Sequence, residues 1–250
     1  MNYPNRTIKY GEKDSKIVKH IQKRLNELGC GPLVVDGDFG PKTRGAVKLF
    51  QSTHFDYLGN HLLIDGKIGP LTWNSMFDIE TDDSDPEITD ELLSEVMKIA
   101  DSQIGVMEEP VGSNKGPEVN EYLKSVGLGP GYYWCAAFVY WCFNEAAKGI
   151  GVDNPLPKTA GCMNHWRRSK GKKIAGKDAQ DNPSLIVPGS VFIINHGGGK
   201  GHTGIVRKVV SGYVHTIEGN SNPNGSRNGI GVFNITRRKV NSINQGYILY

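Results

Sequence analysis

The chain has 250 residues, of which 38% are hydrophobic and 22% charged, a composition typical of globular proteins and sufficient for one large or two smaller domains. Its net charge of +3 is spread unevenly, because residues 92–250 carry 18 Lys or Arg against 11 Asp or Glu. A basic body of this kind could meet a nucleic acid or an anionic cell envelope. No RNA- or DNA-reading motif accompanies the charge, so we expect no nucleic-acid partner.

The apolar segments give no indication of a membrane protein. The N-terminal sequence MNYPNRTIKYGEKDSK is charged and lacks an apolar run, unlike a secretory signal peptide. The longest apolar stretch, residues 134–143, is about half as long as a membrane-spanning helix. We therefore expect a protein made in the cytoplasm without a signal peptide and without stable membrane association.

A short internal repeat lies near the N-terminus. Residues 36–43 read DGDFGPKT and residues 65–72 read DGKIGPLT, and each Asp-Gly followed by Gly-Pro is a turn signal. The apolar spacing within IVKHIQKRLNEL predicts an amphipathic helix that ends near Gly29, and residues 46–51 and 71–77 indicate two more helices. The sequence therefore predicts a small all-α, three-helix domain over residues 10–78.

The repeat resembles the peptidoglycan-binding domain 1 family, whose two half-repeats carry the pattern DG-x-x-GP-x-T. The resemblance covers nearly all of residues 14–77 and implies a wall-binding role without catalysis. The turn residues that it makes candidates for contact with the wall are Asp36, Gly37, Gly40, Asp65, Gly66 and Gly69. The residues alone are equally consistent with turns that only join helices.

Residues 79–91 carry seven acids and no base, and we interpret residues 79–88 as an acidic, solvated linker. The second domain is expected over residues 89–250. It starts with a helix over about 89–103, contains a helical stretch that ends near Lys148, and continues with a Gly/Pro/Lys-rich region to about residue 186. Five short alternating runs then predict strands at 190–195, 204–210, 213–218, 231–236 and 246–250. Helices followed by antiparallel strands indicate an α+β fold.

The four cysteines, Cys30, Cys135, Cys142 and Cys162, show no CxxC spacing typical of zinc sites. If Cys135 and Cys142 share a helix, they lie about 10 Å apart along its axis, too far for a disulfide. His196 and His202 lack a clear third metal ligand. We expect reduced thiols, no metal site and no cofactor.

Cys135 stands where the chain breaks and a helix begins, within PGYYWCAAFVYWCF. The positive end of a helix dipole lowers the pKa of a thiol and favours the reactive thiolate. By itself Cys135 is equally well explained as a core cysteine, and Cys142, two turns later, is expected in the core. Trp134 is expected to line a cleft beside Cys135.

The segment GHTGIVRKVVSGYVHTIEGN predicts a hairpin that places an imidazole beside a carboxylate. With a three-residue loop over residues 210–212, two residues face each other across the hairpin when their numbers add to 422. His202 then pairs with Asn220, Glu218 stands diagonally beside it on the same face, and His215 points to the other face. A two-residue loop would shift this register by one.

The WCAAFV helix start, the GHTGIV strand and the IEGN strand end resemble the CHAP family of papain-like cysteine amidohydrolases and peptidases that act on cell walls. The resemblance covers roughly residues 89–250 and implies a papain-like α+β domain. It makes Cys135 the nucleophile and His202 the base, and it makes Glu218 with Asn220 the groups that orient His202. The third catalytic member remains open between Glu218 and Asn220. The backbone N–H of Cys135 is expected to help bind the oxyanion.

Both resemblances together imply a hydrolase that cuts an amide bond of bacterial peptidoglycan, either as an N-acetylmuramoyl-L-alanine amidase or as an endopeptidase. The arrangement resembles phage endolysins, which act at the wall after release through a membrane pore. An injected antibacterial effector with the same chemistry and a non-catalytic wall-binding protein are the alternatives. We expect a monomer whose partner is peptidoglycan.

Overall fold

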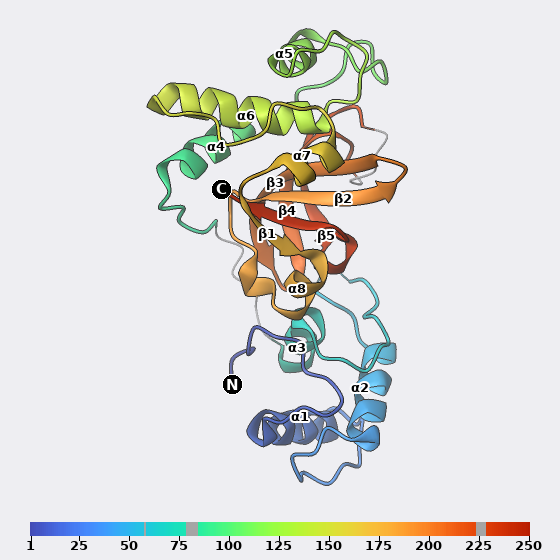
Figure 1. The fold of residues 1–250 in the computed structure, drawn as a ribbon. Helices are drawn as coiled ribbons and strands as arrows, with labels where there is room; N and C mark the ends of the chain where they lie inside the picture. The colour runs from blue at the N-terminus through green and yellow to red at the C-terminus, as the bar shows by residue number, and fades with distance from the viewer. Residues whose placement is uncertain (58, 79–84, 224–228) are drawn as a thin grey trace. The chain divides into compact units, whose positions relative to one another are not determined.

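The computed structural model describes the whole chain except residues 58, 79–84 and 224–228 (Figure 1). The chain forms two compact units, Met1–Asp82 with Asp181–Pro183, and Asp83–Gln180 with Ser184–Tyr250. Each unit has a hydrophobic core of its own. Within the described ranges, no helix is long and apolar enough to cross a membrane.

The expected linker at 79–88 lies mostly outside the described residues. At its described end, residues 85–87 are exposed. Asp85 forms ion pairs with Arg207 at 2.8 Å and with Lys208 at 3.0 Å, both on a strand of the second unit. Acidic composition did not reveal these basic partners, which are distant in the sequence. The assignment of residues 79–88 as a linker stays a prediction.

The first unit contains the three expected helices, α1 (Ser15–Glu27), α2 (Pro41–Thr53) and α3 (Pro70–Phe77). Asp14 caps α1 by accepting hydrogen bonds from the backbone N–H groups of Lys16 and Ile17. The other two helices each begin with a proline after a glycine, and proline is favoured at the first helical position because it has no N–H to leave unpaired.

The repeated turns are held by a glutamine from the preceding helix. Gln22 Nε2 donates to Asp36 Oδ1 at 2.7 Å and to Thr43 Oγ1 at 3.1 Å, while Gln22 Oε1 accepts from the backbone N–H of Gly37 at 2.9 Å. The backbone of Gly37 has φ +84°, and a Cβ there would meet Ser15 Oγ at 2.1 Å, so glycine is required.

The second half-repeat has the same set of glutamine hydrogen bonds 29 residues later. Gln51 Nε2 donates to Asp65 Oδ1 at 3.1 Å and to Thr72 Oγ1 at 3.3 Å, and Gln51 Oε1 accepts from the backbone N–H of Gly66 at 2.8 Å. The DG-x-x-GP-x-T pattern therefore has a structural role in this unit. A direct contact of Asp36, Gly37, Gly40, Asp65, Gly66 or Gly69 with the wall stays a prediction.

The second unit combines helices with an antiparallel sheet, as expected for an α+β fold (Figure 1). Its helices are α4 (Glu91–Ser102), α5 (Pro117–Ser125), α6 (Cys135–Ile150), α7 (Cys162–Arg168) and α8 (Gly176–Asp181). Its strands are β1 (Lys172–Ala175), β2 (Val191–Gly197), β3 (Lys200–Val210), β4 (Tyr213–Ser221), β5 (Gly231–Lys239) and β6 (Gly246–Leu249), in the order β1-β6-β2-β3-β4-β5. The sequence did not indicate α5, α7, α8 or β1, which are short elements.

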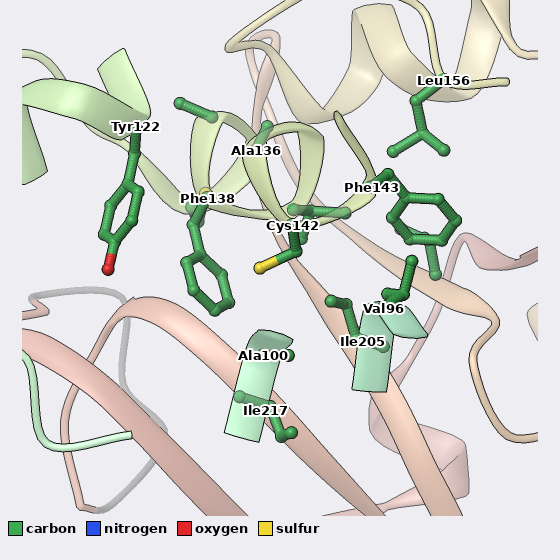
Figure 2. Packing of buried hydrophobic residues seen from close by; sticks show 14 of the residues in the cluster. Val96, Ala100, Tyr122, Ala136, Phe138, Cys142, Phe143, Leu156, Ile205 and Ile217 are labelled. Atoms are coloured by element: carbon green, nitrogen blue, oxygen red, sulfur yellow. The ribbon is translucent and has the colours of Figure 1, made fainter. Parts of the chain in front are cut away.

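Helix α6 packs its apolar face against the sheet and against α4. Figure 2 shows Phe138 and Cys142 on one side of this helix, above Ala100 of α4 and Ile217 of β4. Cys142 is fully buried, as expected for a core cysteine. This packing fixes the N-terminal end of α6, where Cys135 lies, relative to β3 and β4.

The hairpin of β3 and β4 differs from the prediction at its turn. Val210 pairs with Tyr213, so the loop has only two residues, Ser211 and Gly212, with φ of +50° and +84°. Positive φ at both positions is the requirement of a type I′ turn, whose twist matches that of the strands. The three-residue loop was therefore wrong.

A β-bulge at Arg207 corrects the register further along the strands. Lys208 pairs with His215, but Val206 pairs with Thr216, so one residue of β3 is skipped between them. From Val206 toward the start of β3, the numbers of paired residues add to 422, as in Val206 with Thr216 and Ile205 with Ile217. This is the register expected from the sequence. His202 and Glu218 consequently share a face, for a reason that the sequence did not reveal.

Candidate active site

Cys135 is the first residue of α6, and its side chain is only 6% exposed. Its Sγ lies 3.5 Å from Cys162 Sγ. The hydrogen bond from Cys162 lowers the pKa of the Cys135 thiol well below its usual range against the effect of burial, and the neighbouring His202 lowers it further. The local environment therefore favours a thiolate at Cys135.

His202 of β3 forms the expected pair with Glu218 of β4. Its Nε2 lies 2.7 Å from Glu218 Oε2, and both side chains are buried. Because Nε2 is engaged, Nδ1 is the ring nitrogen left to interact with the thiol of Cys135. Burial opposes the charged imidazole, but Cys135 and Glu218 raise the pKa of His202 to about 9. A thiolate and an imidazolium therefore form a stable pair near neutral pH.

Glu218 is fully buried and accepts hydrogen bonds from several side chains besides His202. Arg238 donates to both carboxylate oxygens, from Nε and Nη2, at 2.7 Å each. Thr216 Oγ1 donates to Oε1 at 2.6 Å, and Ser221 Oγ lies 3.2 Å from Oε2. Burial raises the pKa of this carboxyl, but His202 and Arg238 outweigh it and lower the pKa to about 2. Glu218 is thus held ionised and in one orientation.

Asn220 does not take the orienting role expected for it. It is the penultimate residue of β4 and has a left-handed backbone, φ +50°, and its amide lies 2.7 Å from that of Asn114. Turned so that both groups are satisfied, its oxygen accepts from the indole N–H of Trp134 at 2.9 Å. Among the described hydrogen bonds, none joins Asn220 to His202. Asn220 instead connects the loop that carries Asn114 to the start of α6.

Trp134 is fully buried, contrary to the expectation that it lines the cleft. Its Nε1 also donates to Glu108 Oε1 at 2.9 Å, and Glu108 Oε2 accepts from the backbone N–H of Asn114 at 3.0 Å. Its neighbour Tyr133, 70% exposed, takes the place on the cleft. The prediction failed because a partner for the indole N–H, Glu108, lies 26 residues away in the sequence.

The glycines of the GHTGIV and IEGN segments leave room for tight packing around the pair. A Cβ at Gly204 would meet Glu218 Cγ at 2.8 Å and the carbonyl oxygen of Ile217 at 2.7 Å. A Cβ at Gly219 would meet Phe138 Cβ of α6 at 2.6 Å. Both positions therefore require glycine because neighbouring elements approach closely.

A cleft of about 350 Å³ opens onto the two catalytic candidates Cys135 and His202. The other residues that line it are Tyr133, Ala160, Gly161, Cys162, His196, Gly199, Lys200, Gly201 and Asn220. Asn220 thus reaches the cleft although it does not contact the imidazole. In the described part of the chain, no cluster of three or more His, Cys, Asp or Glu side chains could hold a metal ion.

Comparison with known families identifies both units. Residues 127–220 match the CHAP domain, and residues 14–76 match the putative peptidoglycan binding domain. The chain carries a CHAP domain and a peptidoglycan-binding domain 1. The CHAP match spans the helix start at Cys135, the strand of His202 and the strand of Glu218, and it ends at Asn220.

One curated relative and two solved structures are similar to part or all of this chain. The zinc D-Ala-D-Ala carboxypeptidase of Streptomyces albus G is 41% identical over 71 residues, which are 28% of this chain and 26% of the relative. The chain thus spans about a quarter of that protein. Two mutated forms of the resuscitation promoting factor interacting protein RipA align over 100% of this chain and 93% of theirs, with 15% and 16% identity and a TM-score of 0.37. That score is too low to show a shared fold.

Arg238 and Cys162 are residues of the candidate site that the sequence did not indicate. The predicted strand ended at residue 236, so Arg238 fell outside it, whereas β5 continues to Lys239. Cys162 lay in a region interpreted as irregular, whereas it begins α7 and reaches the cleft. One signal could have revealed Arg238. A buried carboxylate such as Glu218 requires a charged partner, and the sequence indicated none besides His202.

Proposed function

We propose that this chain is a peptidoglycan hydrolase that cleaves an amide bond by Cys/His nucleophilic catalysis. The observation that carries the proposal is the arrangement of Cys135, His202 and Glu218, in which a thiol of lowered pKa lies beside an imidazole held by a buried carboxylate. This is the arrangement of an activated nucleophile, a base and an orienting group. The CHAP and peptidoglycan-binding matches support the cell wall as the substrate.

In the proposed first step, the Cys135 thiolate attacks the carbonyl carbon of the scissile amide. The negative charge that develops on the carbonyl oxygen is stabilised by the backbone N–H of Cys135 at the start of α6. The His202 imidazolium then donates its proton to the leaving nitrogen. The C–N bond breaks, an amine departs, and a thioester to Cys135 remains together with a neutral imidazole.

In the second step, His202 acts as a base. It takes a proton from water while the hydroxyl group adds to the thioester carbon, and the C–S bond breaks with the electron pair returning to sulfur. The acid product leaves, and the thiolate–imidazolium pair is restored. Glu218 stabilises the imidazolium in both steps without itself taking up a proton, in keeping with its pKa of about 2.

The N-terminal unit adds affinity for the insoluble polymer. A wall-binding unit on the same chain raises the concentration of the catalytic unit near its substrate. We propose an endolysin-like role on this basis, with the bond cut being either the sugar–peptide amide or a peptide bond of the stem or crossbridge. An injected antibacterial effector would use the same chemistry.

Digestion of purified peptidoglycan, followed by mass spectrometry of the new termini, tests the proposal. An amidase should release stem peptides with a free N-terminal alanine, whereas an endopeptidase should create a new amine within the stem or crossbridge. Cys135→Ala should bind the wall and release neither product. New reducing sugar ends, or unchanged product release by Cys135→Ala, would overturn the proposed reaction.

A further inference from the structure

Two thiols share the wall of the catalytic cleft. Cys135 Sγ and Cys162 Sγ lie 3.5 Å apart, and each residue is the first of its helix, α6 and α7. Both side chains are about 95% buried yet line the cleft, so access to them is limited to what the cleft admits. The other two cysteines differ: Cys142, on the buried face of α6, is enclosed in the core, and Cys30 belongs to the N-terminal unit.

The two sulfur atoms are in non-bonded contact at 3.5 Å. A disulfide has a sulfur–sulfur bond of about 2.05 Å, so the two atoms must approach by roughly 1.5 Å. We infer that side-chain rotations at the two helix starts supply this approach, since the sulfur atoms are already in contact. No other pair of thiols among the described contacts comes this close.

The two thiols also differ in their pKa. A stepwise oxidation requires this difference, because one sulfur must react with the oxidant before the other. Cys162 donates its S–H to Cys135, which raises the pKa of Cys162 well above its usual range and lowers that of Cys135. The Cys135 thiolate is therefore the sulfur that reacts with an oxidant first. Cys162 remains a protonated thiol in direct contact with the sulfur that has reacted.

We propose that Cys135 and Cys162 form a peroxide-sensitive pair, in which oxidation to a disulfide stops hydrolysis reversibly and spares Cys135 from further oxidation. The Cys135 thiolate attacks one oxygen of hydrogen peroxide, the O–O bond breaks, and Cys135 becomes a sulfenic acid. The hydroxide that leaves takes the proton of the His202 imidazolium and becomes water.

Cys162 completes the sequence. The neutral His202 accepts the Cys162 proton as the Cys162 sulfur attacks the sulfenic sulfur. The S–O bond breaks, the departing hydroxide takes up that proton, and a disulfide and water are the products. Peroxide is thereby reduced by two electrons, and the two thiols are oxidised by two. A thiol reductant reduces the disulfide to the two free cysteines and so restores the Cys135 nucleophile.

The experiment treats the full-length protein with graded hydrogen peroxide and then with dithiothreitol. Peptide mapping without reduction should show the peptides of Cys135 and Cys162 linked in the wild type. Hydrolysis of peptidoglycan should fall at least about tenfold with peroxide and return with dithiothreitol, because disulfides are reducible and sulfinic acids are not. The Cys142→Ala variant, which keeps both cleft thiols, should behave like the wild type.

Cys162→Ser is the deciding variant, since its hydroxyl keeps a hydrogen-bond donor but cannot form a disulfide. Relative to its own untreated rate, it should lose activity with peroxide and fail to recover with dithiothreitol, and Cys135 should gain the mass of two or three oxygen atoms. Absence of the linked peptide in the oxidised wild type would overturn the proposal, as would full recovery of the serine variant.

The mapping is independent of the proposed function, because it needs no substrate. If the protein does not cut peptidoglycan but the linked peptide forms, the oxidation site stands and the proposed function fails. If Cys162→Ser does not fold, Cys162→Ala replaces it, and the mapping of the wild type still decides the question.

Discussion

Arg238 and Glu218 are joined by two parallel hydrogen bonds of 2.7 Å, in which the guanidinium Nε and Nη2 each donate to one oxygen of the buried carboxylate. The guanidinium also lies over the ring of Phe192, 5.2 Å from its centroid. A bidentate pair of this kind fixes both the position and the ionisation of the carboxylate. His202 is therefore oriented by a carboxylate that is itself held by an arginine.

The first prediction concerns this arginine. Arg238→Met should lower the free energy of unfolding by about 3–5 kcal/mol, because it leaves a buried carboxylate without its charged partner. Since Arg238 helps to lower the pKa of Glu218, its loss should also weaken the fall of stability as pH drops from about 4.5 toward 2. The free energy of unfolding of Arg238→Lys should lie between those of the wild type and Arg238→Met, because lysine keeps the positive charge but cannot form two parallel hydrogen bonds. Thermal and acid unfolding measure these effects, with exposed Arg237→Met as the matched control; equal stability of the two methionine variants would contradict the prediction.

The second prediction concerns the pH dependence of hydrolysis. His202 must be protonated to donate to the leaving amine, and the pKa of His202 is raised to about 9, so the rate should fall as pH rises through about 9. Glu218→Gln removes the negative charge that stabilises the imidazolium, so this alkaline limb should move to lower pH. Initial rates between pH 5 and 10 measure the shift. A limb at the same pH in both proteins would show that Glu218 does not act on His202 during turnover.

Glu218 also links stability to acid pH. Its pKa is lowered in the folded protein to about 2 from the ordinary value of 4.5, so its contribution is fully present above about pH 4.5 and is lost as pH falls toward 2. Acid unfolding of the wild type should therefore become steep within this window, and Glu218→Gln should show a weaker dependence there. A transition of the same shape in both proteins would count against this linkage.

The third prediction compares the two histidines of the hairpin. His202→Ala should lose most of the hydrolysis rate, about 10²-fold or more, because the thiol loses its acid and base. His215 pairs with Lys208 near the turn and is buried, so His215→Ala should mainly lower stability. Rates of the folded variants, checked by circular dichroism, decide the point. Equal loss of rate in both would mean that the active histidine is misassigned.

The fourth prediction separates the thiols. Cys135→Ala should abolish hydrolysis with little loss of stability, since the side chain lies at a helix start on the cleft. Cys142→Ala should keep the activity and lose about 1–2 kcal/mol, because it removes a packed core atom. Iodoacetamide at neutral pH should inactivate the wild type by alkylating Cys135, as mass spectrometry of the modified peptide can show. An active Cys135→Ala variant would eliminate the proposed mechanism.

The fifth prediction concerns the two units, each of which has its own core. Residues 1–80 alone should sediment with insoluble peptidoglycan. Residues 85–250 alone should still hydrolyse it, but at least about tenfold more slowly at low enzyme concentration, because tethering is lost. Soluble fragments of the wall should be cut equally well by both forms, which provides the control. Equal rates on the intact wall would remove the argument for tethering.

Much of the fold was predictable because its longer elements have clear patterns. The apolar spacing around Ile21 indicated α1, and the Gly-Pro pairs marked the starts of α2 and α3. The Pro-Gly break before Cys135 indicated the start of α6, and Gly-bounded alternation indicated five of the six strands. The short elements β1 and α7 carry too few residues for a periodicity to show.

The site was predictable where its chemistry is local in the sequence. His202 and Glu218 lie on one hairpin, so alternation placed them together even though the turn length was wrong. Arg238, Glu108 and Cys162 reach the site from distant segments, and no local pattern reveals such contacts. Trp134 was placed on the cleft for the same reason, since the polar partner of its indole lies elsewhere in the chain.

The bulge at Arg207 and the two-residue turn at Ser211 and Gly212 compensate each other. Together they accommodate the nine residues 207–215 that lie between the paired Val206 and Thr216. Without Arg207, eight residues would remain, and the same two-residue turn would close a regular hairpin in which His202 keeps its place beside Glu218. The loss of one residue between His202 and Val206 would instead turn the imidazole to the opposite face of the sheet. Natural variation in the length of this hairpin should therefore fall between Val206 and Thr216, on the turn side of the site.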